Sequence, residues 1–114
     1  RKPLQYMRMN ELTTVAEWTT LRSSSQKPFI IFKHSIACPI SADALKRFHQ
    51  GLSIFTAPAF LIIVQTAKDV SEAITRDLSV PHESPQVVIV SDQQAAYTAS
   101  HEAIQSEEIL KHTR

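Results

Sequence analysis

The chain has 114 residues, of which 43% are hydrophobic and 20% charged, so we expect one globular domain with a core of its own. Its formal net charge of +1 provides no basis for binding nucleic acid or an anionic membrane surface, and no apolar run approaches the roughly 20 residues that span a bilayer. A single glycine excludes a glycine-rich phosphate loop, and a single cysteine excludes an internal disulfide, so we expect a reducing, cytoplasmic location.

The N-terminal part of the chain predicts one helix after a start that carries little pattern. Residues 1–8 are interpreted as a cloning remnant or a flexible start, in which residues 4–7 could form a short edge strand. Thr14 and Glu17 have the spacing of a capping box, in which each side chain bonds the backbone N–H of the other residue. We therefore expect a helix that begins after Thr14 and ends near the serines at 23–25.

A buried strand followed by a helix forms the centre of the chain. The β-branched and aromatic run at 29–33 predicts the strand. Apolar residues then recur at helical spacing, at Ile40, Ala44, Leu45 and Phe48. Pro39 suits the first position of this helix, because its missing N–H is not needed there and its fixed φ is close to the helical value. We expect the helix to run to about Gln50, with Gly51 as the C′ residue.

The only cysteine, Cys38, stands at or next to the N-cap of that helix. Unpaired backbone N–H groups and the positive end of the helix dipole point at its sulfur and favour the thiolate, which is the reactive form. A thiolate attacks a disulfide sulfur and leaves a mixed disulfide, and without a second cysteine an external thiol or a reductase must release the captured partner. The opposing interpretation is that Cys38 is a small buried hydrophobic residue.

The second half of the chain predicts three strands and two helices. The expected strands are residues 59–65, 87–90 and 95–99. A turn at 92–94 joins the last two strands. A second capping box, Asp69 to Glu72, opens one helix, and the final helix begins near Ser106. Strands and helices that alternate before a closing hairpin and helix predict an α/β fold, with an open mixed sheet covered on both faces.

Three segments resemble the monothiol bacilliredoxins, the YtxJ family of the thioredoxin-like superfamily. They are Lys33-His-Ser-x-x-Cys-Pro-Ile-Ser41, Val80-x-His-Glu-Ser-Pro-Gln86 and Tyr97-x-Ala-Ser-His101. The resemblance covers nearly the whole chain in consistent order. It implies a thioredoxin-like fold, with a mixed central sheet and helices on both faces. It also implies a redox protein that removes bacillithiol, a low-molecular-weight thiol, from protein mixed disulfides.

Carried over residue by residue, the resemblance makes Cys38 the attacking thiol. Ser41 stands where dithiol relatives have a second, resolving cysteine, and its hydroxyl can hydrogen-bond the thiolate but cannot attack in turn. Pro85 corresponds to the cis-proline that lies across from the active-site sulfur in this fold, so the Ser84–Pro85 bond is expected to be cis. Cys38 and Ser41 are therefore the candidate catalytic residues.

Six residues are candidates for binding the thiol ligand: His34, Pro39, His82, Glu83, Ser84 and Pro85. The histidines have an alternative interpretation as structural side chains with satisfied hydrogen bonds. Two positions depart from the family pattern. Ala37 replaces a threonine before the cysteine, and Pro81 replaces a lysine, which removes a positive charge near the thiol-binding groove.

The resemblance also implies the partners. Bacillithiol is the expected co-substrate, with no tightly bound cofactor, and S-thiolated proteins are the expected substrates. Bacillithiol itself or a reductase would regenerate the thiol. We expect a monomer that binds neither nucleic acid nor membrane. A metal site is not expected, because one cysteine and scattered histidines lack the spacing of zinc ligands.

Two other functions stay open. A monothiol glutaredoxin-like iron–sulfur carrier would hold a cluster between two Cys38 thiolates and two small thiols, and the purified protein would be coloured. A thioredoxin-fold adaptor would carry an inert cysteine, and it would not react with a thiol reagent at mildly acidic pH.

Overall fold

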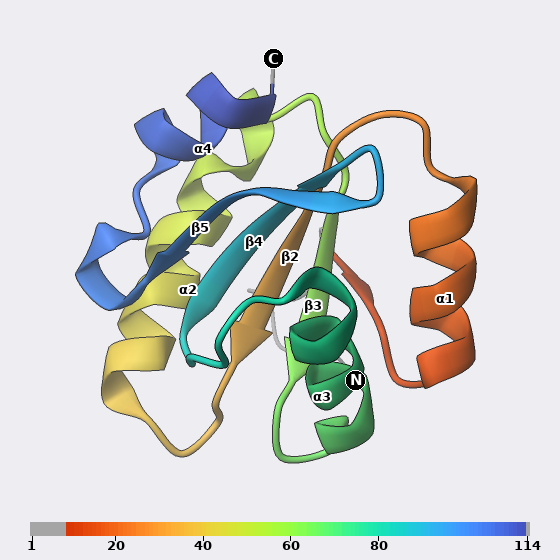
Figure 1. Ribbon diagram of the computed structural model, residues 1–114. Coiled ribbons are helices and arrows are strands. Elements are labelled where there is room, and N and C mark those ends of the chain that lie inside the picture. The colour runs from red at the N-terminus through yellow and green to blue at the C-terminus, as the bar shows by residue number, and fades with distance from the viewer. Residues whose placement is uncertain (1–8, 114) are drawn as a thin grey trace.

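The computed structural model describes residues 9–113, which form a mixed sheet with helices on both faces (Figure 1). The interpretations of residues 1–8 lie outside the described residues. The strands are β1 (Asn10–Glu11), β2 (Phe29–His34), β3 (Ala59–Ile63), β4 (Gln86–Ser91) and β5 (Gln94–Ser100). The helices are α1 (Val15–Ser24), α2 (Pro39–Gly51), α3 (Lys68–Leu78) and α4 (Ser106–Thr113), with short 3-10 turns η2 (Leu52–Ile54) and η3 (His101–Ala103).

The strands lie in the order β1-β3-β2-β4-β5, with β2 at the centre. β1, β3 and β2 run parallel, whereas β4 pairs antiparallel with both β2 and β5. The turn between β4 and β5 consists of Asp92 and Gln93, whose φ values of 52° and 66° suit the right-handed twist of a tight hairpin. This sheet confirms the expected α/β fold class.

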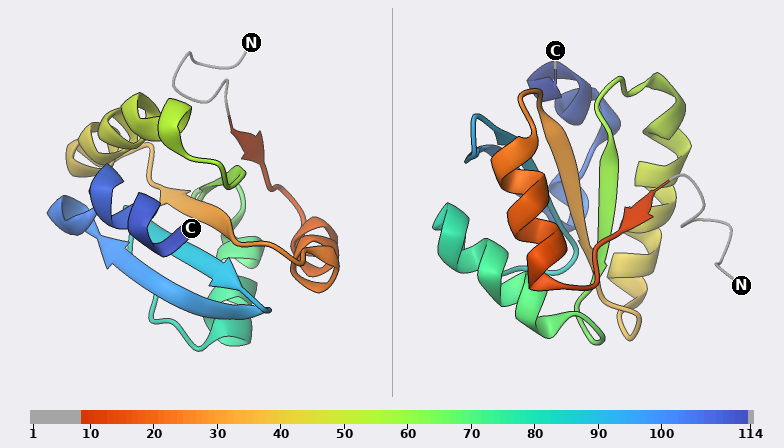
Figure 2. Two further views of the ribbon diagram at one scale, coloured as in Figure 1. Left: turned by 90° about the horizontal axis from the view of Figure 1, so that it is seen from above. Right: turned by 90° about the vertical axis from the view of Figure 1, so that its right-hand side faces the viewer.

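Two hydrophobic clusters cover the two faces of the sheet. Ile30 and Phe32 of β2 belong to the cluster that includes side chains of α2 and α4. Phe29 and Ile31, which alternate with them, belong to the cluster that includes side chains of α1 and α3. The two further views show the same division of the helices between the faces (Figure 2). All six residues of β2 are buried, as in a strand that is covered on both sides.

One of the two predicted capping boxes is present. Thr14 Oγ1 accepts the N–H of Glu17, and the Glu17 carboxylate accepts the N–H of Thr14. The predicted box at Asp69 is wrong, because α3 has Ala67 as its N-cap residue and no side chain caps it. Asp69 lies within the first turn, where its carboxylate accepts the N–H of Val70 and its charge suits the helix dipole.

Gly51 is the last residue of α2 and not the C′ residue beyond it, which corrects the prediction. Its φ of −89° is ordinary helical geometry, and the chain continues directly into η2. The reason for glycine is a close approach, because a Cβ at this position would collide with Ser106 Oγ and lie 3.2 Å from Phe55 Cζ. The missing side chain lets the end of α2 pack against the start of α4.

Candidate active site

Cys38 lies where β2 passes into α2, as predicted. β2 ends at His34, residues 35–37 form a turn, and Cys38 is the N-cap residue with Pro39 at the start of the helix. The Cys38 carbonyl accepts the N–H of Ala42 at 3.0 Å, while its side chain makes no capping hydrogen bond. Cys38 is partly exposed. Its thiol therefore stands at the positive end of a 13-residue helix, within reach of solvent.

Gln65 holds the turn that carries Cys38. Its Oε1 accepts the N–H of Ile36 at 3.1 Å, and its Nε2 donates to Ser35 Oγ at 2.7 Å. Gln65 follows β3, the parallel neighbour of β2, so both loops leave the sheet at the same edge. The sequence pattern did not single out Gln65, because its partners lie about 30 residues away and nothing local marks the contact.

Ser41 is fully buried and bonds two residues at the end of β2. Its Oγ accepts the N–H of Ser35 at 3.0 Å and lies 2.8 Å from His34 Nδ1. Burial lowers the pKa of His34, which favours the neutral ring, and a neutral Nδ1 can accept the hydroxyl proton. These bonds join β2 to the first turn of α2. They engage the hydroxyl oxygen of Ser41 with His34 and with the backbone of Ser35.

The Ser84–Pro85 peptide bond is cis, as the resemblance implied. The Pro85 carbonyl accepts the N–H of His101 at 3.2 Å, and β4 begins at the next residue. Gln86 pairs with Lys33 of β2, a few residues before Cys38. The Pro85 turn and the Cys38 turn therefore leave the sheet at the same edge. Direct contact between Pro85 and Cys38 stays a prediction.

A polar cluster lies on the other face of β2, around Lys33, to which the sequence pattern assigned no role. Lys33 is 1% exposed. Its Nζ donates to the Ser71 carbonyl and to Thr75 Oγ1, both at 3.2 Å, and to His82 Nδ1 at 3.4 Å. Within residues 9–113 no carboxylate forms an ion pair with it. The only signal in the sequence is a lysine inside an apolar strand.

Burial sets the protonation of this cluster. It lowers the pKa of Lys33 to about 8. It also lowers the pKa of His82, with a further contribution from the charge of Lys33, while Glu83 acts in the opposite direction. At neutral pH the cluster therefore holds an ammonium ion whose hydrogen-bond partners among residues 9–113 are all neutral.

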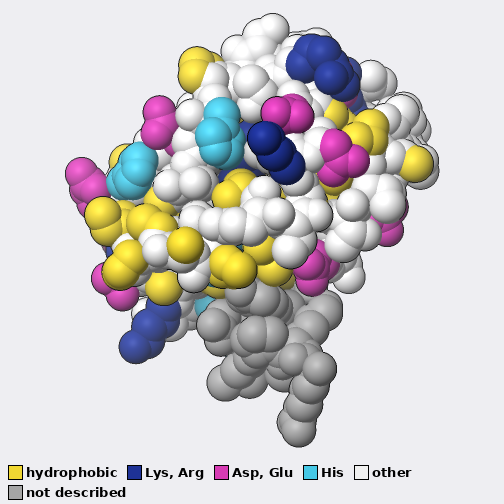
Figure 3. All heavy atoms as spheres, turned by 90° about the horizontal axis from the view of Figure 1, so that it is seen from below, with side chains coloured by type: hydrophobic (Ala, Val, Ile, Leu, Met, Phe, Trp, Pro, Cys, Tyr) yellow, Lys and Arg dark blue, Asp and Glu magenta, His cyan; other side chains and the backbone are white. Residues whose placement is uncertain are grey.

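Exposed hydrophobic side chains flank Cys38. Ile36 is 59% exposed and Ile40 is 55% exposed, on either side of the cysteine. The molecule seen from below shows hydrophobic side chains gathered next to histidine and charged side chains (Figure 3). An apolar surface of this kind is suited to contact with another protein.

The described part of the chain has neither a cluster of metal-ligating side chains nor a helix that could span a membrane. Among residues 9–113, no three His, Cys, Asp or Glu side chains are placed to hold a metal ion together. No helix in this range combines the length and the apolar character needed to cross a bilayer.

The fold, with a cysteine at a helix N-terminus and a cis-proline turn at the same sheet edge, defines a thioredoxin-fold thiol redox protein. A family model described as monothiol bacilliredoxin BrxC matches residues 10–109, and the chain belongs to this family. The resemblance inferred from the three sequence segments is thus confirmed.

Solved structures show the same fold at low sequence identity. A candidate oxidoreductase with a thioredoxin fold is 23% identical, with a TM-score of 0.86 and coverage of 99% of this chain and 100% of that one. Oxidised mitochondrial thioredoxin 3 from Saccharomyces cerevisiae is 14% identical, with a TM-score of 0.73 and 96% coverage of each chain. A thioredoxin from Fasciola hepatica is 13% identical, with a TM-score of 0.73 over 93% of this chain and 100% of that one.

Proposed function

We propose that the protein is a monothiol thiol–disulfide oxidoreductase that removes bacillithiol from protein mixed disulfides, with Cys38 as the attacking thiol. One observation carries this proposal. The only cysteine of the chain occupies the partly exposed N-cap position of α2. A helix N-terminus favours the thiolate, and membership of the monothiol bacilliredoxins supports bacillithiol as the thiol that is removed.

The first step is a thiol–disulfide exchange. The Cys38 thiolate attacks the bacillithiol sulfur of a protein mixed disulfide and forms a new S–S bond to it. The old S–S bond breaks, and the substrate protein leaves as a thiolate that takes up a proton from water. One disulfide replaces another, so no external oxidant or reductant is consumed in this step.

The second step needs a thiol from outside the chain. A free bacillithiol thiolate, or the thiolate of a reductase, attacks the captured bacillithiol sulfur and releases Cys38 as a thiolate. Ser41 has no sulfur, and its hydroxyl is engaged by His34 and Ser35. The mixed disulfide on Cys38 should therefore persist until the second thiol arrives.

The proposed ligand groove follows the sheet edge around Cys38. Pro39, His82 and Glu83 are exposed there, and Ser84 is half-buried before the cis bond to Pro85. His34 is only 4% exposed, so we assign it a positioning role through Ser41 instead of contact with the ligand.

The substrates would be S-bacillithiolated proteins, which the exposed Ile36 and Ile40 would contact beside the sulfur. Bacillithiol is a co-substrate and not a resident cofactor. The protein would act as a cytoplasmic monomer, and binding to nucleic acid or membranes plays no part.

De-thiolation of a bacillithiolated protein, followed by intact mass spectrometry of both partners, tests the proposal. Wild type should gain one bacillithiol while the substrate loses it. Cys38→Ser should gain none, because a hydroxyl is a far poorer nucleophile near neutral pH. A glutathionylated substrate serves as the comparison for the identity of the thiol. If wild type and Cys38→Ser behave alike, the inert adaptor takes the place of the enzyme.

A further inference from the structure

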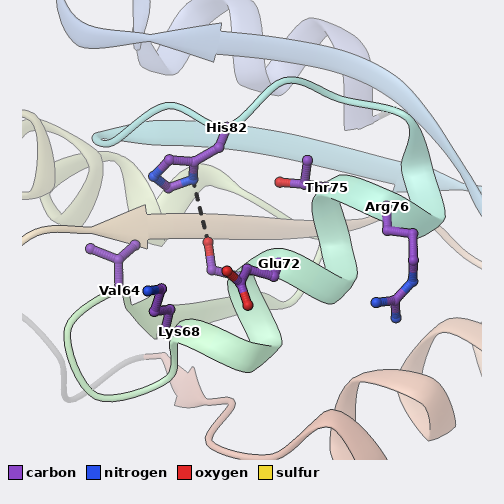
Figure 4. Close-up of a pocket in the computed structure, with 7 residues that line it drawn as sticks. Val64, Lys68, Glu72, Thr75, Arg76 and His82 are labelled. Carbon is purple, nitrogen blue, oxygen red and sulfur yellow. Dashed lines mark hydrogen bonds between the residues drawn. The ribbon is translucent and has the colours of Figure 1, made fainter.

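A cavity of about 430 Å³ lies against α3 and the turn before β4, on the opposite face of the sheet from α2 (Figure 4). We call it the α3 cavity, and its lining residues run from Val64 through α3 to His82. Its volume lies within the range of roughly 300–1,000 Å³ that is typical of small-molecule sites. Of the residues proposed to bind the thiol ligand, His82 alone lines this cavity, and the two exchange steps proposed for Cys38 involve none of its other lining residues.

A buried positive charge lies directly behind the wall of the α3 cavity. The three hydrogen-bond partners of Lys33 Nζ are Ser71, Thr75 and His82, and all three line the cavity. A buried ammonium ion is costly unless a negative charge compensates it. No described carboxylate pairs with Lys33, so an anion in the α3 cavity would supply the missing counter-charge.

The hydrogen-bond pattern leaves a donor proton on each of two lining side chains, Thr75 and His82. An ammonium group can only donate, so His82 Nδ1 accepts from Lys33 and the ring proton lies on Nε2. Thr75 Oγ1 also accepts from Lys33, which leaves its own proton available to a ligand. In Figure 4 the Thr75 hydroxyl is turned toward His82, and the second ring nitrogen of His82 is turned away from α3.

The rim of the cavity adds to its positive charge. Lys68 and Arg76 contribute two exposed cations, and Glu72 contributes one carboxylate. Together with Lys33, the surroundings of the cavity carry a net positive charge that favours an anion. Val64 and the methylene stems of the two basic side chains provide apolar wall. The best match is one carboxylate on a short apolar chain.

We propose that the α3 cavity binds a small organic acid, with its carboxylate near Thr75 and Lys68 and with Lys33 as the buried counter-charge. The carboxylate has two possible sources. It belongs either to a separate metabolite or to the acidic part of a thiol held on Cys38, since Val64 directly precedes Gln65, the residue that holds the Cys38 turn.

Pentanoate is the probe and its neutral amide, pentanamide, is the matched control. The host is Cys38→Ser, so binding is measured without any thiol chemistry, and failure here would leave the proposed function untouched. Pentanoate should shift the backbone amide NMR signals of Val64, Ser71 and Thr75, and pentanamide should not. Equal binding of the two, or tighter binding of inorganic phosphate, would overturn the proposal.

Substitutions locate the charge. Lys33→Met should weaken pentanoate binding by roughly tenfold or more, because the buried counter-charge is lost. Lys46→Met, which removes an exposed lysine of α2, should leave it unchanged. Thr75→Val keeps the shape of the side chain and removes the hydroxyl, so it should also weaken pentanoate binding. It serves as the test if Lys33→Met disturbs the fold. Unchanged affinity in a folded Lys33→Met protein would rule out Lys33 as the counter-charge.

A last titration uses wild type that carries bacillithiol on Cys38. Loss of pentanoate binding would show that the captured thiol already occupies the α3 cavity, so that its carboxylate is the natural ligand. Retained binding would assign it to a separate acid.

Discussion

Lys33 and His34 are consecutive residues, and both are buried titratable side chains whose pKa burial lowers. His34 with a lowered pKa is neutral at pH 7 and costs little to bury. Lys33, with a pKa of about 8, is still charged at that pH, and its hydrogen-bond partners in the described part of the chain are all neutral. The buried charge of Lys33 should therefore lower the stability of the folded state.

Removing the charge should stabilise the protein. The pKa of Lys33 falls from 10.5 to about 8 on folding. The folded state therefore has its full stability above pH 10.5, where Lys33 is neutral, and loses part of it as the pH falls through about 8 and Lys33 becomes charged. At neutral pH, Lys33→Met should raise the free energy of unfolding by about 1–3 kcal/mol, and this gain should shrink above pH 8. Urea titrations on either side of pH 8 measure it, with Lys46→Met as the control. A loss of stability at neutral pH would contradict the interpretation.

Ser41→Ala should destabilise the protein, whereas Lys33→Met should stabilise it. Ser41→Ala removes the hydroxyl that bonds His34 and the backbone N–H of Ser35 in a fully buried place. The free energy of unfolding should fall by about 1–3 kcal/mol, the usual cost of a lost buried partner. Ser53→Ala, at an exposed position, should change it little. Equal denaturant midpoints for the two variants would show that the Ser41 bonds contribute nothing.

Ser41→Cys should change the course of the reaction. A thiol one helical turn after Cys38 can attack the mixed disulfide and release the captured bacillithiol as an internal disulfide forms. Mass spectrometry should then find the adduct only briefly in Ser41→Cys, whereas it persists on wild type. A long-lived adduct on Ser41→Cys would show that position 41 is out of reach of the Cys38 sulfur.

At the scale of elements, α2 depends on contacts at both of its ends. Its N-terminus is held through Gln65, which bonds the turn before Cys38, and through Ser41. Its C-terminus meets α4 at Gly51, where no side chain would fit. The position of the cysteine therefore depends on the turn after β3 and on α4 as well as on its own helix.

Gly51→Ala tests the contact at the C-terminal end. The new Cβ would collide with Ser106 Oγ and crowd Phe55, so the free energy of unfolding should fall by about 1–3 kcal/mol. Because the hydroxyl is the nearest obstacle, adding Ser106→Ala should restore part of the loss. Circular dichroism melts of the single and double variants measure both effects. A double variant no more stable than Gly51→Ala alone would place the strain elsewhere.

At the scale of the whole molecule, short sequence patterns predicted the parts of the fold that depend on a few consecutive residues. The β2 run, the Cys-Pro helix start and the Thr14 capping box are each set by a few consecutive residues, and all three are present. The Asp69 box failed because α3 begins two residues earlier than that spacing predicts, with Ala67 as its N-cap residue. Gln65 and Lys33 were missed because their partners lie about 30 to 49 residues away, and only the folded sheet brings them together.

The alternation of side chains along β2 has a consequence for how this chain can change. Lys33 faces the α3 side and His34 the α2 side, with the full thickness of the sheet between their surroundings. Inserting or deleting one residue within β2 would exchange the two sides for every residue beyond that point. The lysine would then point at the thiol-bearing helix and the imidazole at the cavity. A substitution in β2 can alter either the Lys33 cluster or the His34–Ser41 contact alone, but any change in the length of β2 would disrupt both.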